Sequence, residues 1–176
     1  MWRRWKPLSN TRRNMTGDSL TVGLGEVKLS RDPSDVLVAY GLGSCVGIGM
    51  YDPAAKVAGL LHAVLPEHNN GADPASSKYV DSGIKGLLNQ LERMGADRKR
   101  LIVRMVGGAN MLTAPGFQQT LSIGDRNVAS ARAVLANLNL RIRAEEVGGN
   151  VGRTMRLYVC DGRMTMRMLG GQEREI

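Results

Sequence analysis

Two residues in this sequence could form a nucleophile and its base. Cys45 follows the Gly-rich segment Gly41-Leu42-Gly43-Ser44, and His62 lies downstream of it. The thiolate rather than the thiol attacks a carbonyl carbon, so a reactive cysteine needs a group that removes its proton. A neighbouring imidazole can take this proton and later give it to a leaving amine. The pair predicts acyl-transfer chemistry at Cys45, with Gly43 and Ser44 presenting backbone N–H groups to an oxyanion.

The same residues also have a purely structural interpretation. Cysteine is among the most buried residue types, and a single histidine on a strand is commonly a packed, hydrogen-bonded side chain. Cys160, which precedes a turn sequence, is expected to be a core thiol, and His68 an exposed loop residue. The spacing alone leaves both catalysis and packing open for Cys45 and His62.

Cofactor and metal motifs do not fit. Gly41-Leu42-Gly43 is not continued as a dinucleotide-binding motif, because Gly47 comes one residue late and a strand is expected to follow it. The two cysteines and two histidines lack the close spacing of a structural zinc site. We predict no cofactor and no metal.

A hairpin is expected to position the two candidate residues. Residues 46–51 and 56–65 have the composition of strands, and Asp52-Pro53-Ala54-Ala55 between them is a favourable turn sequence. If these turn residues form a four-residue loop, Tyr51 pairs with Lys56.

This register has a direct consequence for the site. It places Cys45 opposite His62, with Cβ atoms about 5 Å apart. Gly47, Gly49 and Ala58 share their face of the sheet, and their small size would leave space for a substrate side chain. A slip of one residue would send the two side chains to opposite faces, so the prediction depends on the loop.

The other elements predict an α/β (α+β) fold, a single-domain mixed β-sheet sandwich with two main helices. One amphipathic helix is expected from Tyr79 and ends at Gly95, and another begins at Ser122 with Asp125 in an approximate capping box. Strands outnumber helices and several are linked as hairpins, which favours a mixed sheet. Further strands are expected at residues 20–29, 36–39, 101–106, 140–147, 154–160 and 163–169.

Composition and charge narrow the classes of protein. The 176 residues are 43% hydrophobic, and no apolar run approaches a membrane span or a secretory signal. The net charge is +8, of which five positive charges precede the first acid, Asp18, so the remainder carries only about +3. We predict a basic, disordered extension over residues 1–15 and a domain over residues 16–176. We expect no nucleic-acid binding, no membrane insertion and, with only two cysteines, a reducing cytoplasmic location.

Several motifs resemble the CheD family of chemoreceptor glutamine deamidases. They lie in the family's order between about residues 20 and 172: GLGSCVG (41–47), HAVLP (62–66), GGANM (107–111), IGDRN (123–127) and EEVGGNVGR (145–153). The resemblance implies a cysteine-deamidase-like sandwich with Cys45 and His62 as catalytic residues. It implies conversion of glutamines on the cytoplasmic helices of chemoreceptors to glutamates. A CheC-type phosphatase partner and, in some relatives, methylesterase activity are further expectations.

One position departs from the family pattern. The family has a threonine six residues before the cysteine that orients the histidine, and this sequence has Ala39 there. A backbone carbonyl, a water or another side chain must then orient His62. This departure favours the alternative function, a non-catalytic adaptor that binds a CheC-type phosphatase or a receptor.

The remaining family motifs have less specific roles. Asn127 and Arg126, at the start of the second helix, could bind substrate or cap structure, and both interpretations stay open. Gly107-Gly108 and Gly148-Gly149 are expected to shape the backbone around the site.

Overall fold

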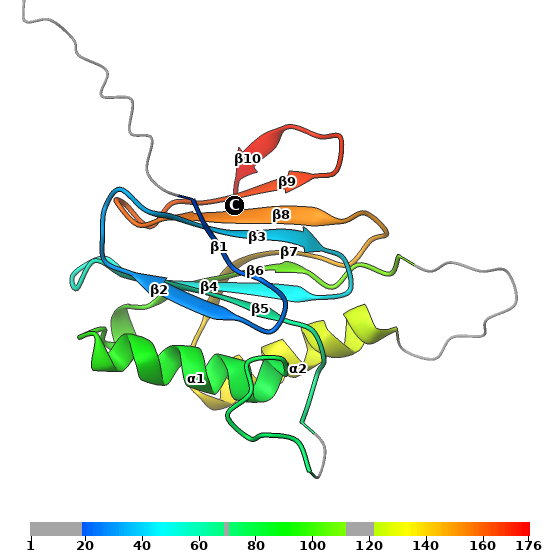
Figure 1. Ribbon diagram of the computed structural model, residues 1–176, viewed down its shortest axis with the longest axis horizontal. Coiled ribbons are helices and arrows are strands. Elements are labelled where there is room, and N and C mark those ends of the chain that lie inside the picture. The colour runs from blue at the N-terminus through cyan, green and yellow to red at the C-terminus, as the bar shows by residue number, and fades with distance from the viewer. Residues whose placement is uncertain (1–18, 69–70, 112–121) are drawn as a thin grey trace, which may run out of the picture.

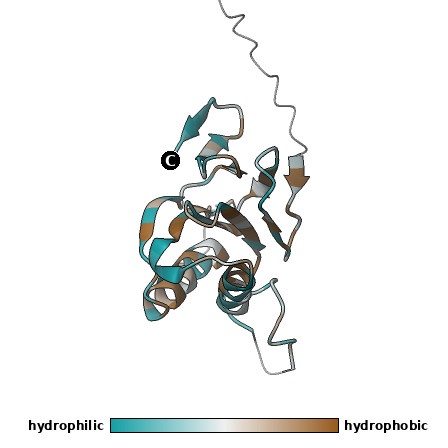
Figure 2. Ribbon diagram, turned by 90° about the vertical axis from the view of Figure 1, so that its left-hand side faces the viewer, coloured by the Kyte–Doolittle hydropathy of each residue, from teal (hydrophilic) through white to brown (hydrophobic). Residues whose placement is uncertain are grey.

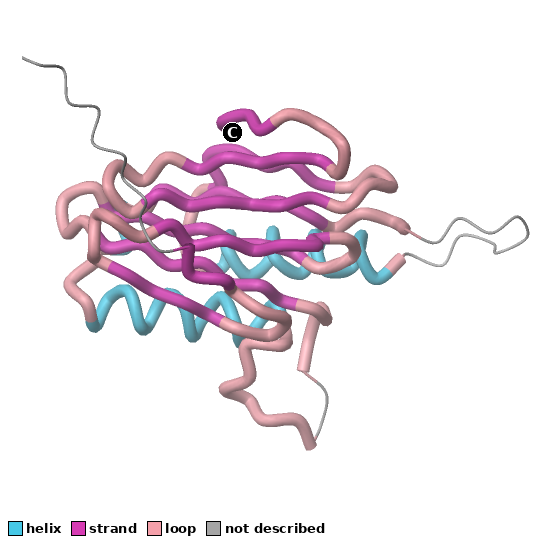
Figure 3. The backbone as a smooth tube through the Cα atoms, turned by 45° about the horizontal axis from the view of Figure 1, so that its top comes forward, coloured by secondary structure: helices cyan, strands magenta, loops and turns pink. Residues whose placement is uncertain are grey.

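The chain folds into three layers, two sheets and a pair of helices (Figure 1). The computed structural model describes residues 19–68, 71–111 and 122–176. The outer sheet has the strand order β1-β3-β8-β9-β10, and the central sheet has the order β2-β5-β4-β6-β7. Helices α1 and α2 cover the face of the central sheet that points away from the outer sheet (Figures 1 and 3). The predicted α+β sandwich with two main helices is confirmed. The predicted extension over residues 1–15 lies outside the described residues.

The outer sheet contains β1 Ser19–Thr21, β3 Val36–Leu42, β8 Arg153–Tyr158, β9 Met164–Met168 and β10 Glu173–Glu175. The central sheet contains β2 Val27–Ser30, β4 Val46–Asp52, β5 Val57–Ala63, β6 Ile102–Gly107 and β7 Ile142–Val147. The helices are α1 Val80–Arg93 and α2 Ile123–Asn137, with the short 3₁₀ helix η1 Arg98–Arg100 before β6. In Figure 2, β10 beside the C terminus is hydrophilic, whereas the apolar colour lies mainly on the inner strands and helix faces.

The prediction of one strand over residues 20–29 is wrong, because the segment divides between the two sheets. β1 runs parallel to β3 in the outer sheet, and β2 pairs antiparallel with β5 in the central sheet. Gly25 has φ +69°, a value that glycine adopts without strain, and the chain turns there. The N–H of Gly25 donates to the carbonyl of His62 at 2.8 Å. The segment between β1 and β2 therefore crosses from one sheet to the other beside His62.

Two apolar cores lie on the two sides of the central sheet. Strands β4 and β5 are buried at every position, because helices cover one face and the outer sheet covers the other. Val46, Ile48 and Met50 face the helices, as the predicted alternation requires. The core between the sheets combines the opposite face of this hairpin with β3: Cys45, Tyr51, Ala58, Leu60, Leu37, Ala39 and Leu42.

The helices begin where the sequence indicates. Ser122 caps α2, since its Oγ accepts from the N–H of Asp125 at 3.2 Å and its hydroxyl donates to the Asp125 carboxylate at 2.7 Å. Val128, Ala131 and Leu135 are buried against the sheet, as predicted for the inner stripe of α2. In the part of the chain that the structure describes, no helix is both long and apolar enough to cross a membrane.

A buried carboxylate closes the β4–β5 turn. The Asp52 side chain is fully buried and accepts from the N–H groups of Ala54, Ala55 and Asp97 at 2.8, 3.1 and 2.7 Å. Arg100 donates to the same carboxylate through Nη2 at 2.8 Å and Nε at 3.1 Å. Burial alone would raise the pKa of Asp52, but these donors outweigh it and hold the pKa far below its ordinary range.

We expect Asp52→Asn to lower the free energy of unfolding by about 2 kcal/mol at pH 7, because it removes a charged acceptor of several hydrogen bonds. A depressed pKa in the folded state stabilises the protein fully above the unfolded value, near 4, and the contribution is lost as the pH falls. Urea titrations of native protein and variant should therefore differ most at neutral pH, and the difference should shrink progressively as the pH falls from about 4 toward the depressed folded pKa. A difference that stays constant down to pH 2 would contradict this account.

Candidate functional site

The β4–β5 hairpin brings Cys45 and His62 to one face of the central sheet, but not directly opposite each other. Asp52 pairs with Val57 and Gly47 pairs with His62. The predicted pairing of Tyr51 with Lys56 is therefore wrong by two residues in register. Lys56 has φ +52° and belongs to the turn, which moves the four-residue loop one position along the chain.

A register change of two residues preserves the face of every side chain, since strand side chains alternate. Cys45, directly before β4, is thus diagonal to His62 near the end of β5. Both side chains point into the layer between the two sheets, where the Cys45 residue is 8% exposed and His62 is 2% exposed. The sequence correctly predicts the shared face and incorrectly predicts direct opposition.

The space expected beside the two glycines of β4 is filled. A Cβ on Gly47 would lie 2.9 Å from Leu42 Cδ1, and one on Gly49 would lie 2.7 Å from Met164 Sδ. These glycines therefore let side chains of the outer sheet pack closely onto β4. The expectation that they leave room for a substrate is wrong. Gly43 and Ser44, directly before Cys45, are partly exposed.

His62 is oriented by a main-chain acceptor from the N-terminal part of the chain. Its Nδ1 lies 3.1 Å from the carbonyl oxygen of Val22. A carbonyl only accepts, so we assign the proton to Nδ1 and the free lone pair to Nε2. Among the described residues, the buried Nε2 has no hydrogen-bond partner. The Val22 carbonyl thus supplies the orienting group that Ala39 lacks.

Burial sets the resting protonation of both candidate groups. Burial lowers the pKa of His62 below its ordinary value, against the opposing effects of the Val22 hydrogen bond and Glu26. Burial also raises the pKa of Cys45, and a hydrogen bond from the Cys45 backbone N–H acts in the opposite direction. Both shifts favour the neutral thiol and the neutral imidazole over the ion pair.

Three successive carbonyl groups before β4 are held by different donors. The Gly43 carbonyl accepts from the N–H of Ala109 at 2.7 Å, and the Cys45 carbonyl accepts from the N–H of Gly108 at 2.8 Å. The Ser44 carbonyl between them accepts from Asn127 Nδ2 at 2.8 Å. In a trans peptide the N–H points away from the preceding carbonyl, so the N–H groups of Ser44 and Cys45 face the other way. Within residues 19–68, 71–111 and 122–176, neither donates to a backbone carbonyl. The N–H of Gly43, in contrast, donates to the Gly41 carbonyl at 2.9 Å. The prediction that Gly43 presents its N–H to an oxyanion is therefore wrong, and the N–H groups free of a backbone acceptor among the described residues of this segment are those of Ser44 and Cys45.

The glycines at the end of β6 and directly after it allow this close approach, as expected from the sequence. Gly107 has φ +123°, and a Cβ there would lie 2.2 Å from the Cys45 carbonyl oxygen. Gly108 has φ +64°, and its Cβ would lie 2.3 Å from Val128 Cγ2. Gly148 also contributes, because its carbonyl accepts from the buried guanidinium of Arg153 at 2.7 Å. These glycines shape the backbone that supports residues 43–45.

The other predicted residues, Asn127, Arg126 and Cys160, differ in their burial and in their position in the fold. Asn127 is fully buried, and its Nδ2 donates to the Val64 carbonyl at 2.9 Å as well as to Ser44. Arg126 is exposed on the first turn of α2. Cys160 is an exposed free thiol in the β8–β9 turn, so the prediction of a core thiol is wrong.

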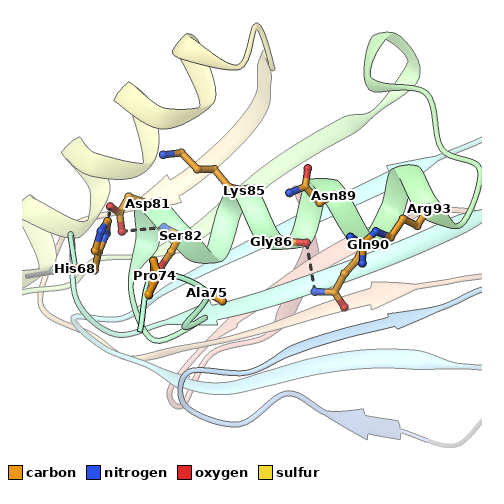
Figure 4. A pocket seen from close by; sticks show the side chains of 10 residues that line it. All are labelled: His68, Pro74, Ala75, Asp81, Ser82, Lys85, Gly86, Asn89, Gln90 and Arg93. Atoms are coloured by element: carbon orange, nitrogen blue, oxygen red, sulfur yellow. Dashed lines mark hydrogen bonds and ion pairs between the residues drawn. The ribbon is translucent and has the colours of Figure 1, made fainter. Parts of the chain in front are cut away.

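A hollow lies elsewhere, along the outer side of α1 (Figure 4). Its volume is about 570 Å³, and neither Cys45 nor His62 lines it. His68 at its edge is paired with Asp81 at 2.8 Å, and the Ser82 hydroxyl donates to the Ser76 carbonyl at 2.5 Å. The hollow therefore contains no cysteine and no serine paired with a base, and we place the candidate site at Cys45.

Fold and site define an α+β domain in which a buried thiol and an imidazole with a free Nε2 share one face of a β-hairpin. The family model described as CheD chemotactic sensory transduction matches residues 64–168. The chain belongs to the CheD family.

Relatives of similar length support the assignment. A Symbiobacterium thermophilum protein named probable chemoreceptor glutamine deamidase CheD is 42% identical over 157 residues, covering 88% of this chain and 95% of that protein. An Archaeoglobus fulgidus protein of the same name is 40% identical, covering 89% of this chain and 98% of the relative. Among solved structures, the Bacillus licheniformis hypothetical protein YfiH has a TM-score of 0.45 and 15% identity, over 68% of this chain and 49% of that one.

Proposed function

We propose that this chain deamidates glutamine side chains of bacterial chemoreceptors, with Cys45 as the nucleophile and His62 as the base. The observation that carries the assignment of roles is the hydrogen bond between His62 Nδ1 and the Val22 carbonyl. It leaves Nε2 unprotonated on the face that the imidazole shares with the thiol. The substrate class is supported by the relatives, which are named for this reaction.

The reaction begins when His62 Nε2 takes the proton of the Cys45 thiol. The sulfur attacks the side-chain carbonyl carbon of glutamine, a C–S bond forms, and the carbonyl π electrons move to the oxygen. The N–H groups of Ser44 and Cys45 donate to this oxyanion. Nε2–H then protonates the amide nitrogen, the C–N bond breaks, and ammonia leaves a γ-glutamyl thioester.

Hydrolysis of the thioester completes the cycle. His62 Nε2 removes a proton from a water molecule, whose oxygen attacks the thioester carbon. The C–S bond breaks, glutamate is released, and the thiolate recovers a proton from His62. Cys45 and His62 are diagonal at rest, so a side-chain rotation must shorten their separation when substrate binds. Catalytic hydrogen bonds commonly tighten only in the substrate complex.

The partners follow from this activity. The substrate is the cytoplasmic helical part of a chemoreceptor, which places the protein in the cytoplasm. Binding of a CheC-type phosphatase stays a prediction. The adaptor alternative rested on the missing hydroxyl at Ala39, and the Val22 carbonyl supplies an orienting acceptor from the main chain instead.

The function is tested by incubating the protein with receptor cytoplasmic fragments and mapping glutamine-to-glutamate conversion by mass spectrometry. The Cys160→Ala variant should convert the same glutamines as native protein, because Cys160 is exposed in the β8–β9 turn. In this variant Cys45 is the one remaining cysteine, so alkylation of its thiol by iodoacetamide should abolish conversion. Equal conversion by alkylated and untreated samples would reject the proposed function, as would no conversion by native protein across a panel of receptors.

A further inference from the structure

Asn127 connects the two halves of the candidate site through the main chain. Its Nδ2 is 2.8 Å from the Ser44 carbonyl oxygen and 2.9 Å from the Val64 carbonyl oxygen. Ser44 directly precedes Cys45, and Val64 follows His62 by two residues. Both acceptors are carbonyl groups, so the NH₂ of the amide must face them and both of its hydrogens are used.

We propose that Asn127 is a positioning residue, which fixes the peptide between Ser44 and Cys45 so that the N–H of this peptide faces the oxyanion. Through its second hydrogen bond, Asn127 also connects this peptide to the segment that follows His62. The inference rests on the proposed function for its catalytic consequence. α2, which carries Asn127, begins at the same end of the sandwich as the connection from β3 to β4 (Figures 1 and 3).

The middle of the three held peptides depends on a side chain. The Gly43 and Cys45 carbonyls accept from backbone N–H groups of the segment after β6. The Ser44 carbonyl accepts instead from Asn127. Because N–H and C=O are antiparallel in a trans peptide, the direction of the Ser44 carbonyl sets the direction of the Cys45 N–H. Loss of Asn127 would free this one peptide and leave its two neighbours held.

The burial of Asn127 agrees with a role for its donors. The residue is 0% exposed, and among the described residues its Oδ1 has no hydrogen-bond partner. A buried acceptor without a partner destabilises the fold. An apolar side chain would avoid this penalty but would leave the Ser44 and Val64 carbonyls without their donor. The hydrogen bond from the Cys45 N–H that opposes the rise in the Cys45 pKa also depends on the orientation of this peptide.

The test compares Asn127→Ala with Ser130→Ala. Ser130 is a matched control because it is also buried in α2, and its hydroxyl donates to the carbonyl of Pro66, not to a carbonyl of residues 43–45, at 2.8 Å. Three quantities are measured for each variant: the thermal midpoint, kcat and KM for deamidation, and the rate of Cys45 alkylation by iodoacetamide against pH. Alkylation is followed at Cys45 by peptide mass spectrometry.

Both variants should lose stability, and only Asn127→Ala should change the chemistry. We expect its kcat to fall about 10- to 100-fold with KM changed by less than about threefold, because an oxyanion donor is displaced. Its alkylation rate near neutral pH should fall at least about threefold, since the thiolate loses the fixed N–H. Both quantities should stay near native values in Ser130→Ala.

Other outcomes decide against the proposal or separate it from the proposed function. Native-like alkylation of Asn127→Ala at every pH, with a kcat no lower than that of Ser130→Ala, would overturn it. If native protein shows no deamidation, the proposed function fails and the alkylation comparison still decides whether Asn127 positions Cys45. If Asn127→Ala does not fold, Asn127→Asp replaces it, because the carboxyl group has the same shape and donates at most one hydrogen bond.

Discussion

Cys45→Ser should lower kcat for glutamine deamidation at least about 10⁴-fold, because loss of the nucleophile removes the covalent pathway. The hydroxyl is similar in shape to the thiol but much less acidic, so the same imidazole cannot generate a comparable nucleophile. The rate is measured as ammonia release together with glutamate formation on a receptor fragment. Thermal unfolding of the variant verifies that the domain is intact, since burying a hydroxyl in place of the 8% exposed thiol costs about 1–2 kcal/mol.

The second cysteine provides the control for this experiment. Cys160→Ser changes an exposed thiol in the β8–β9 turn and should leave kcat within about twofold of native. A Cys45→Ser variant that retains a tenth of the native kcat would show that Cys45 is not the nucleophile.

His62→Ala should lower kcat/KM about 10³-fold, within the range expected for loss of a general base. It should also change the pH dependence. The base must be neutral to act, and burial lowers the pKa of His62, so the acid limb of kcat/KM for native protein should lie below the ordinary histidine value of about 6.5. In the variant this limb should disappear, and the residual activity should rise with pH as the Cys45 thiol ionises, with a raised pKa.

The other histidine is the matched control for His62. His68→Ala removes a side chain that is 40% exposed and paired with Asp81, away from the candidate site, and should leave the pH profile unchanged. A His62→Ala profile with the native acid limb would remove this imidazole from the mechanism.

Strand periodicity explains why much of the hairpin was predictable from sequence. Val46, Ile48 and Met50 alternate with small residues, and this period fixes which side chains share a face. The register was not predictable, because the observed pairing requires Lys56 to adopt a left-handed φ of +52°, which is unusual for its residue type. An error of two residues left Cys45 and His62 on the same face and changed only their separation.

The supporting contacts of the site were less accessible to sequence reasoning. The Gly107-Gly108 motif correctly indicated a constrained backbone, because glycine is required where φ is positive and another chain segment lies close. The sequence indicates Asn127 as a candidate but not its acceptors, which are main-chain carbonyls of residues 44 and 64 and depend on tertiary packing. The split of residues 20–29 hid the acceptor of the His62 imidazole for the same reason.

The use of the Val22 carbonyl has a consequence for mutational studies of this domain. An alanine scan removes side chains and leaves every main-chain oxygen in place, so replacing Val22 would report the loss of a nearly fully buried apolar side chain. Such a scan would not detect the contribution of the Val22 carbonyl to the orientation of His62. In a semisynthetic protein, the amide bond that follows Val22 can be replaced by an ester. This change would weaken the Val22 carbonyl as an acceptor while retaining the valine side chain. The contribution of this peptide group to catalysis can therefore be separated from that of side-chain packing only by a chemical change to the backbone.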